Sequence, residues 1–182
     1  HPSITVAGLT GSPYTRQAGL DATTDGLQKA FLIAVIACLI IAVVAMRSFR
    51  YGVVTIIPIM LVVAWLYAFM FAFGFGLNFI TATIAAISVG VGIDYAIHMT
   101  QRFREELGRA GGDPVEGLRR AAGGTGAALI ASATTSILGF AIMAFAPMPM
   151  FASYGILTAV MIFLAAVASL AVLPSLLLLV TP

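Results

Sequence analysis

The apolar residues of this chain fall into five long runs, separated by short polar or glycine-rich stretches. A transmembrane helix needs about 20 mostly apolar residues to cross a hydrocarbon core of roughly 30 Å, and each run is long enough. The pattern predicts an all-α integral membrane protein whose five transmembrane helices form a bundle. The predicted spans cover residues 27–46, 52–73, 77–100, 125–146 and 151–180, within a transmembrane domain of residues 27–182.

The residues before the first run, 1–26, are rich in Ser, Thr, Gly and Pro and carry mixed charge. Ile4-Thr5-Val6 is a strand candidate, and Gly11-Ser12-Pro13 is a turn candidate. We interpret this segment as the end of an extracytoplasmic domain or as a tail. Because the chain starts with His1 and lacks a signal-peptide pattern, we expect it to be a piece of a longer protein.

Two further features concern helix ends. Asp113, Pro114 and Glu116 supply a cap, a proline at the first helical position and an acid at the third, which predicts a short helix at about 114–122 on the membrane surface. Pro174 leaves open whether the fifth helix ends near Leu173 as a surface turn or continues to residue 180.

Charge supports the membrane assignment and gives it an orientation. The chain is 61% apolar and only 9% charged, whereas soluble domains carry about 25% charged residues. The net charge of +2 is too small to suggest nucleic-acid binding. Arginines follow the first and third spans, so the positive-inside rule puts those loops in the cytoplasm, the N-terminus outside and the C-terminus inside the cell membrane. The single cysteine, Cys38, offers neither a disulfide framework nor metal-ligand spacing.

The third span carries the candidate chemistry, because Asp94, Tyr95 and His98 interrupt its apolar sequence. A carboxylate within a membrane is costly, and its default interpretation is functional. Residues four apart share a helix face, which gives two rows of mostly small residues. Small residues allow close helix packing, so we expect Asp94 to point into the bundle. The rows are Ala86, Gly90, Asp94 and His98, and Ser88, Gly92 and Ala96.

Burial disfavours the charged form of a carboxylate, so we expect Asp94 to load and release a proton. Tyr95 could donate a hydrogen bond to a carboxylate across a helix interface, and His98 is a candidate proton relay. Thr134 and Thr135 are candidate partners in the fourth span. Each has a structural alternative: a polar lock for Asp94, packing for Tyr95, an interface role for His98, and bonds to their own helix for the two threonines.

Three motifs resemble one family. GVGIDYAIHMTQRFREEL (90–107) resembles the fourth transmembrane helix of the RND (resistance–nodulation–division) superfamily, in its MmpL-like, hopanoid-exporter and Patched-like branches. The family's glycine-rich approach and Asp-Tyr pair fall on Gly90, Gly92, Asp94 and Tyr95. SATTSILGF (132–140) resembles the fifth helix, and LAVLPSLLLL (170–179) resembles the end of the sixth. The chain would then be helices two to six of one RND half, similar to a sterol-sensing domain.

The resemblance implies proton-driven export of lipids or other hydrophobic molecules, with Asp94 and Tyr95 as the proton-coupling site and no cofactor besides protons. The implied partners are membrane lipid, a hydrophobic substrate and a second RND half, in the same chain or a second copy. The alternative is a sterol- or lipid-sensing module that transports nothing. An intramembrane hydrolase is disfavoured, because Asp94 and His98 on consecutive turns of one helix do not surround a substrate bond.

Overall fold

The computed structural model describes residues 12–75 and 79–181, without the side chains of residues 12–25, 27, 28, 79–82, 85, 86 and 88. Every regular element in this described part is a helix. The candidate strand at Ile4-Thr5-Val6 lies outside it. The elements are α1 (Ser12–Met46), α2 (Phe49–Ala72), α3 (Phe79–Arg109), α4 (Pro114–Ala121), a π turn η1 (Ala122–Gly126), α5 (Ala127–Ile142), a 3₁₀ turn η2 (Met143–Phe145), α6 (Pro149–Val167), a π turn η3 (Ala168–Val172) and α7 (Leu173–Val180).

The all-α membrane bundle predicted from the apolar runs is confirmed. Four stretches of the described chain are long and apolar enough to cross a membrane: Lys29–Met46, Phe49–Ala72, Pro114–Phe145 and Pro149–Val180. They correspond to the first, second, fourth and fifth predicted spans. The third predicted span lies in α3, whose 31 residues extend over about 46 Å at 1.5 Å per residue. Its passage through the membrane stays a prediction.

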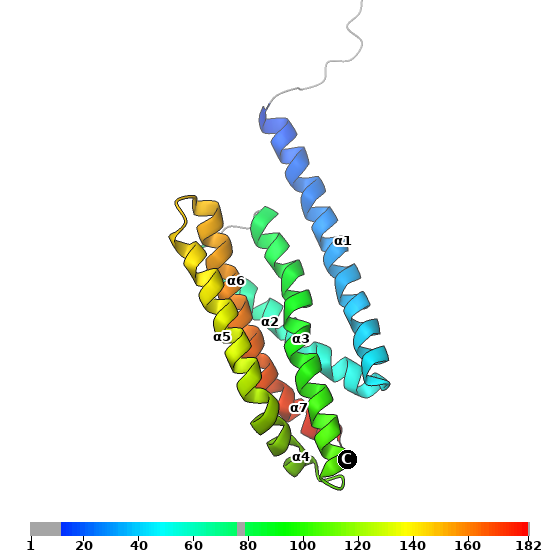
Figure 1. Ribbon diagram of the computed structural model, residues 1–182. Coiled ribbons are helices and arrows are strands. Elements are labelled where there is room, and N and C mark those ends of the chain that lie inside the picture. Colours follow the sequence, from blue (N-terminus) through cyan, green and yellow to red (C-terminus); the bar gives the residue numbers. More distant parts are fainter. Residues whose placement is uncertain (1–11, 76–78, 182) are drawn as a thin grey trace, which may run out of the picture.

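The helices alternate in direction, and α3 lies at the centre of the bundle. Figure 1 shows α3 between α1 and α5, with α2 and α6 behind it. The α1–α2 turn, the end of α3, α4 and α7 gather toward the lower end of that view, opposite the start of α1. We call this lower end the basic end, because it collects these arginines: Arg47, Arg50, Arg102, Arg104, Arg109, Arg119 and Arg120. Which side of the membrane it faces stays a prediction.

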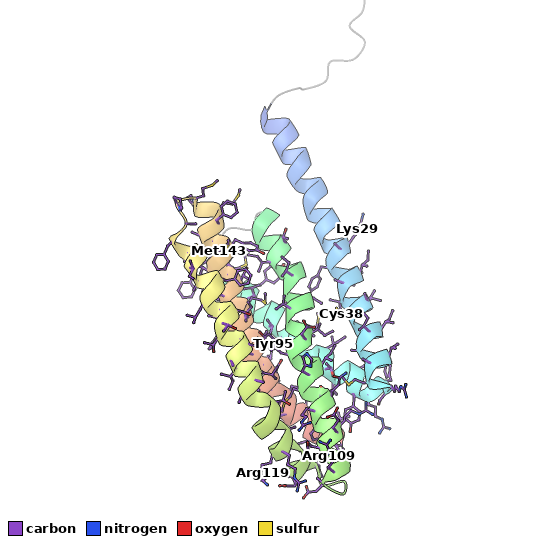
Figure 2. All side chains as sticks on the ribbon, in the orientation of Figure 1. Lys29, Cys38, Tyr95, Arg109, Arg119 and Met143 are labelled. Atoms are coloured by element: carbon purple, nitrogen blue, oxygen red, sulfur yellow. The ribbon has the colours of Figure 1, made fainter. Side chains whose placement is uncertain are left out.

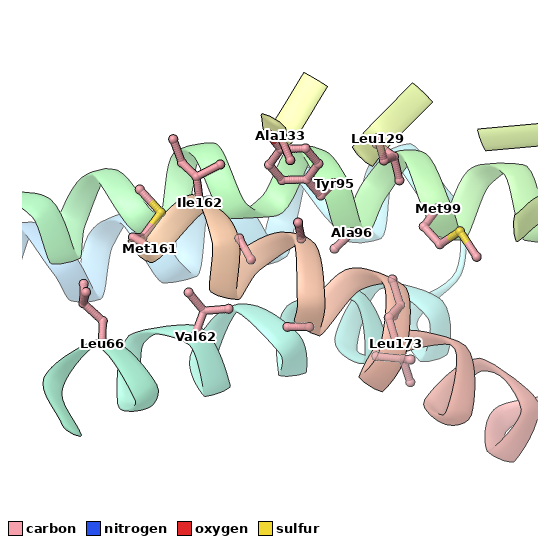
Figure 3. Packing of buried hydrophobic residues seen from close by; sticks show 14 of the residues in the cluster. Val62, Leu66, Tyr95, Ala96, Met99, Leu129, Ala133, Met161, Ile162 and Leu173 are labelled. Atoms are coloured by element: carbon pink, nitrogen blue, oxygen red, sulfur yellow. The ribbon is translucent and has the colours of Figure 1, made fainter. Parts of the chain in front are cut away.

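Two apolar clusters hold the bundle together. The larger one joins α2, α3, α5, α6 and α7, and Figure 3 shows part of it. The smaller one joins α1, α2 and α3 through Ala42, Ile59, Val63, Val89 and Ile93. Close helix contact in membranes depends on small residues. At Gly155 of α6, a β-carbon would lie 2.6 Å from the carbonyl oxygen of Phe140 in α5 and 2.5 Å from Met143 Cβ in η2, so the chain segments meet there only because the residue is glycine.

The predicted helix at 114–122 is present, but it is not a separate element. Asp113 caps it as expected, because its carboxylate accepts hydrogen bonds from the N–H groups of Val115 at 2.9 Å and Glu116 at 3.3 Å. Through the π turn η1, α4 then continues into α5 without a break. A π turn cannot be predicted from an apolar pattern, because it changes the hydrogen bonds and leaves the composition unchanged.

The first helix begins earlier than the sequence suggested, and the last one follows the longer of the two predicted ends. The helix α1 begins at Ser12, so the second part of the expected tail is helical. The fifth run does not end near Leu173, because α6 passes through η3 into α7 and reaches Val180. Pro174 lies in the first turn of α7, where its missing N–H costs little. Leu173 and Leu177 are fully buried and hold α7 in the core.

Candidate functional site

The candidate residues lie in the middle of α3, on two faces with opposite surroundings. Tyr95 and Ala96 are buried in the larger cluster. Gly90, Asp94 and His98 share one exposed face, which we call the Asp94 face. Asp94 was expected to point into the packed bundle, and within this chain it does not. The described helices leave its side of α3 open, although it lies 15 positions from either end of that 31-residue helix.

The helical geometry shows where the Asp94 face points. On a helix of 3.6 residues per turn, Asp94 projects between Ile93 and Tyr95. Ile93 packs in the cluster that includes α1, and Tyr95 packs in the cluster that includes α5. The Asp94 face therefore opens between α1 and α5, the two helices that flank α3 in Figure 2.

The two rows of small residues behave differently. A β-carbon at Gly92 would lie 3.8 Å from Ala165 Cβ, so Gly92 packs against α6, and Ala96, one turn further on, is also fully buried. At Gly90 no described atom lies within 4 Å of such a β-carbon. Its expected role in packing finds no partner helix within the described residues. The side chains of Ala86 and Ser88 lie outside the described part, so their roles stay predictions.

Tyr95 is a packing residue in this chain. Its side chain is only 7% exposed, and Figure 3 shows its ring beside Ala133, with Leu129 one turn away. No hydrogen bond joins its hydroxyl to another of the described residues. Tyr95 is thus one of the residues that pack α3 against α5.

Thr134 and Thr135 do not approach α3. Both are exposed on α5, and their hydroxyls bond to their own helix. Thr134 donates to the carbonyl oxygen of Ile130 at 2.7 Å, and Thr135 donates to those of Ser132 at 2.9 Å and Ala131 at 3.2 Å. The local alternative describes both residues in this structure, and partnership with Asp94 is not seen here.

A buried pair of hydroxyl groups, which was not predicted from the sequence, joins two helices. Thr55 of α2 and Thr100 of α3 lie 3.1 Å apart, and both are fully buried. Thr55 also donates to the carbonyl oxygen of Tyr51 at 2.7 Å, so Thr100 is the donor in the pair. The four-residue spacing could have indicated that Thr100 is buried, because Thr100 continues the row of Gly92 and Ala96 by one turn. This pair joins α2 to α3 toward the basic end.

Side chains at the basic end connect α3 to its neighbours. Arg104 donates to the carbonyl oxygen of Met46, and its guanidinium lies 4.9 Å from the ring centre of Tyr51. The Tyr51 hydroxyl lies 3.1 Å from Thr181 Oγ1, beyond the end of α7. These contacts tie the end of α3 to α1, α2 and the C-terminal residues. A change in the tilt of α3 would thus be felt by all three.

Two ionisable side chains lie on successive turns of the Asp94 face: the carboxylate of Asp94 and the imidazole of His98. Among the described residues, no three His, Cys, Asp or Glu side chains lie where they could hold a metal ion together. The Asp94 face thus consists of a carboxylate, an imidazole and a glycine on the central helix of the bundle.

The fold and this site define a multi-pass membrane bundle with a carboxylate in its central helix. Residues 2–182 match the MMPL family, so the chain belongs to that family, which comprises RND-type membrane transporters and related modules. The chain is also similar to a protein of Methanocaldococcus jannaschii whose name describes a membrane protein. They share 30% identity over 168 residues, which cover 92% of this chain and 43% of that relative. The chain thus spans less than half the length of this relative.

Proposed function

We propose that this chain is the transmembrane core of an exporter driven by the proton gradient, with Asp94 as the coupling carboxylate. The observation that carries the proposal is the location of Asp94, midway along α3 on a face that the described helices leave open. A charged side chain within a membrane helix is costly, by up to about 2.5–3.5 kcal/mol at the helix centre. Because the carboxylate is costly and no packing within the described residues requires it, we interpret Asp94 as a functional residue.

The cost also favours a partner on the Asp94 face. The membrane-spanning stretch of α1 is only 11% buried, and so is that of the helix containing α5, whereas the stretch containing α6 is 56% buried. The layer of α1, α3 and α5 is therefore the more open side of the bundle. We propose that a second RND half, in the same chain or a second copy, covers this layer. Gly90, which has free space around it, would let a partner helix approach closely.

The proposed mechanism follows from the two faces of α3. Protonation of Asp94 would remove its charge and change its hydrogen bonds to the facing helix. Tyr95 would act as a positioning residue, because its packing on α5 would set the rotation of α3. His98, one turn nearer the basic end, would relay the proton. The resulting tilt of α3 would pass to α1 and α2 through Arg104 and drive the movement of a lipid or other hydrophobic substrate.

The test is lipid efflux from proteoliposomes that contain the full-length protein under an imposed pH gradient. A fluorescent phospholipid serves as the probe. Asp94→Asn should abolish the gradient-dependent efflux, because the amide keeps the shape and cannot exchange the proton. Glu105→Gln is the matched control: it removes an exposed carboxylate from the same helix, where Glu105 pairs only with Arg102 at 3.2 Å.

The outcomes separate the two candidate functions. Efflux that stops in Asp94→Asn and continues in Glu105→Gln supports proton-coupled export. Gradient-driven efflux that continues in Asp94→Asn contradicts the coupling role. Lipid binding that is equal in both variants and independent of pH, without efflux in the wild type, would instead favour the lipid-sensing module.

A further inference from the structure

A pocket at the basic end lies apart from the Asp94 face. It has a volume of about 420 Å³ and is lined by Phe49, Arg50, Val53 and Val180. Small-molecule sites have volumes of about 300–1,000 Å³, so it is large enough for part of a lipid. The pocket brings the first turns of α2 next to the last residue of α7. It therefore joins segments that are 130 positions apart in the chain, where Tyr51 and Thr181 also meet.

The lining combines one cation with an apolar wall. Arg50 is exposed and forms no ion pair with the described residues, whereas Arg102, Arg109, Arg119 and Arg120 all pair with glutamates. The other three lining residues are apolar, and Phe49 leaves 69% of its side chain exposed. An unpaired guanidinium beside apolar side chains fits a ligand with an anionic group joined to a hydrocarbon chain.

The location narrows that ligand to a lipid of the surrounding bilayer. The pocket lies where two membrane helices end, which is the depth of the lipid headgroups. A guanidinium binds a phosphate through two parallel hydrogen bonds, and basic pockets between transmembrane helices bind acidic headgroups. We propose that this pocket binds an anionic phospholipid, with its phosphate on Arg50 and an acyl chain along Val53 and Val180. The site is independent of the proton coupling at Asp94.

The test is native mass spectrometry of the full-length protein in detergent, titrated with phosphatidylglycerol or with phosphatidylcholine of the same acyl chains. We expect wild-type protein to bind phosphatidylglycerol about tenfold more tightly than phosphatidylcholine. Arg50→Gln should lose most of that preference, and Val53→Trp should weaken the binding of both lipids, because the larger side chain fills the pocket. Arg119→Gln is the matched control, because it removes an exposed arginine at the same end that already pairs with Glu116 at 2.7 Å.

Three results would overturn the proposal. The first is an unchanged preference for phosphatidylglycerol in Arg50→Gln. The second is an equal loss in Arg119→Gln, which would show a general effect of positive charge. The third is displacement of the lipid by inorganic phosphate at matched concentration, which would show an anion site without a lipid. Because Arg50 is exposed, its loss should leave folding intact, and the unfolding temperature in detergent checks this.

Discussion

Two faces of α3 differ although their residues are neighbours in sequence. Tyr95 is 7% exposed and packs on α5, whereas Asp94, one position earlier, is exposed between α1 and α5. Gly92 meets Ala165 of α6, whereas Gly90 meets no described atom. One face is therefore accounted for by the packing of this chain. The other meets no packing partner among the described residues, which separates the two faces by their surroundings.

The largest expected effect is on the packing face. Tyr95→Ala should lower the free energy of unfolding by about 3–5 kcal/mol, because it removes a buried aromatic ring. Asp94→Ala should leave that free energy unchanged or raise it, since it removes a charge from the membrane interior. Unfolding of the full-length protein in mixed micelles measures both. Equal destabilisation by the two substitutions would contradict the difference between the two faces of α3.

The glycines offer a second test of the same contrast. Gly92→Leu should cost about 1–3 kcal/mol, because the added side chain overpacks the contact with Ala165 of α6. Gly90→Leu should spare the packing of this bundle and reduce gradient-driven efflux, because it fills the space proposed for the partner half. Unfolding and efflux of each variant are compared with the wild type. A Gly90→Leu protein with full activity would argue against a close partner there.

A smaller effect is expected at the buried hydroxyl pair. Thr100→Val keeps the shape of the side chain and removes the donor to Thr55. Hydrogen bonds between membrane helices contribute about 0.6 kcal/mol on average and about 1.7 at most, so the loss should fall in that range. Thr55→Val combined with Thr100→Val, in a double-mutant cycle, isolates the pair. Additive losses in the cycle would show that the two hydroxyls do not stabilise each other.

The smallest effect is expected on α5. Thr134→Val and Thr135→Val should each change the free energy of unfolding by less than about 0.5 kcal/mol, because the hydroxyls are exposed and bond only to their own helix. Efflux should also persist in both variants. A loss of efflux as large as that of Asp94→Asn would restore these threonines as partners of the carboxylate.

The sequence predicts that α3 has two rows of small residues, but it does not predict which row is buried against another helix of the chain. The four-residue spacing places Gly90, Asp94 and His98 on one face, and the structure shows them there. Small residues occur in both rows, so the pattern does not reveal which row meets a helix of the same chain. Only the packing of α6 against Gly92 decides it, and that contact joins residues more than 70 positions apart.

The sequence predicted the helices and one helix start, but it did not predict where the first helix begins or where the π turns lie. Apolar runs identify helices that can enter a membrane, and the Asp113-Pro114 pair identifies a helix start, where Asp113 accepts a hydrogen bond from the N–H of Val115. The start of α1 at Ser12 was missed, because a polar segment can extend a helix beyond the apolar part. The π turns were missed as well, because they share no residue pattern: η1 is rich in glycine, whereas η3 is mostly apolar.

The central claim is that Asp94 is the group that gains and loses the proton. The most direct measurement is infrared difference spectroscopy of the full-length protein in lipid, recorded between alkaline and acidic pH. We predict a carboxylic-acid carbonyl band that appears on acidification, is absent in Asp94→Asn and persists in Glu105→Gln. An unchanged band in Asp94→Asn would show that the proton binds elsewhere and would contradict the proposed role of Asp94.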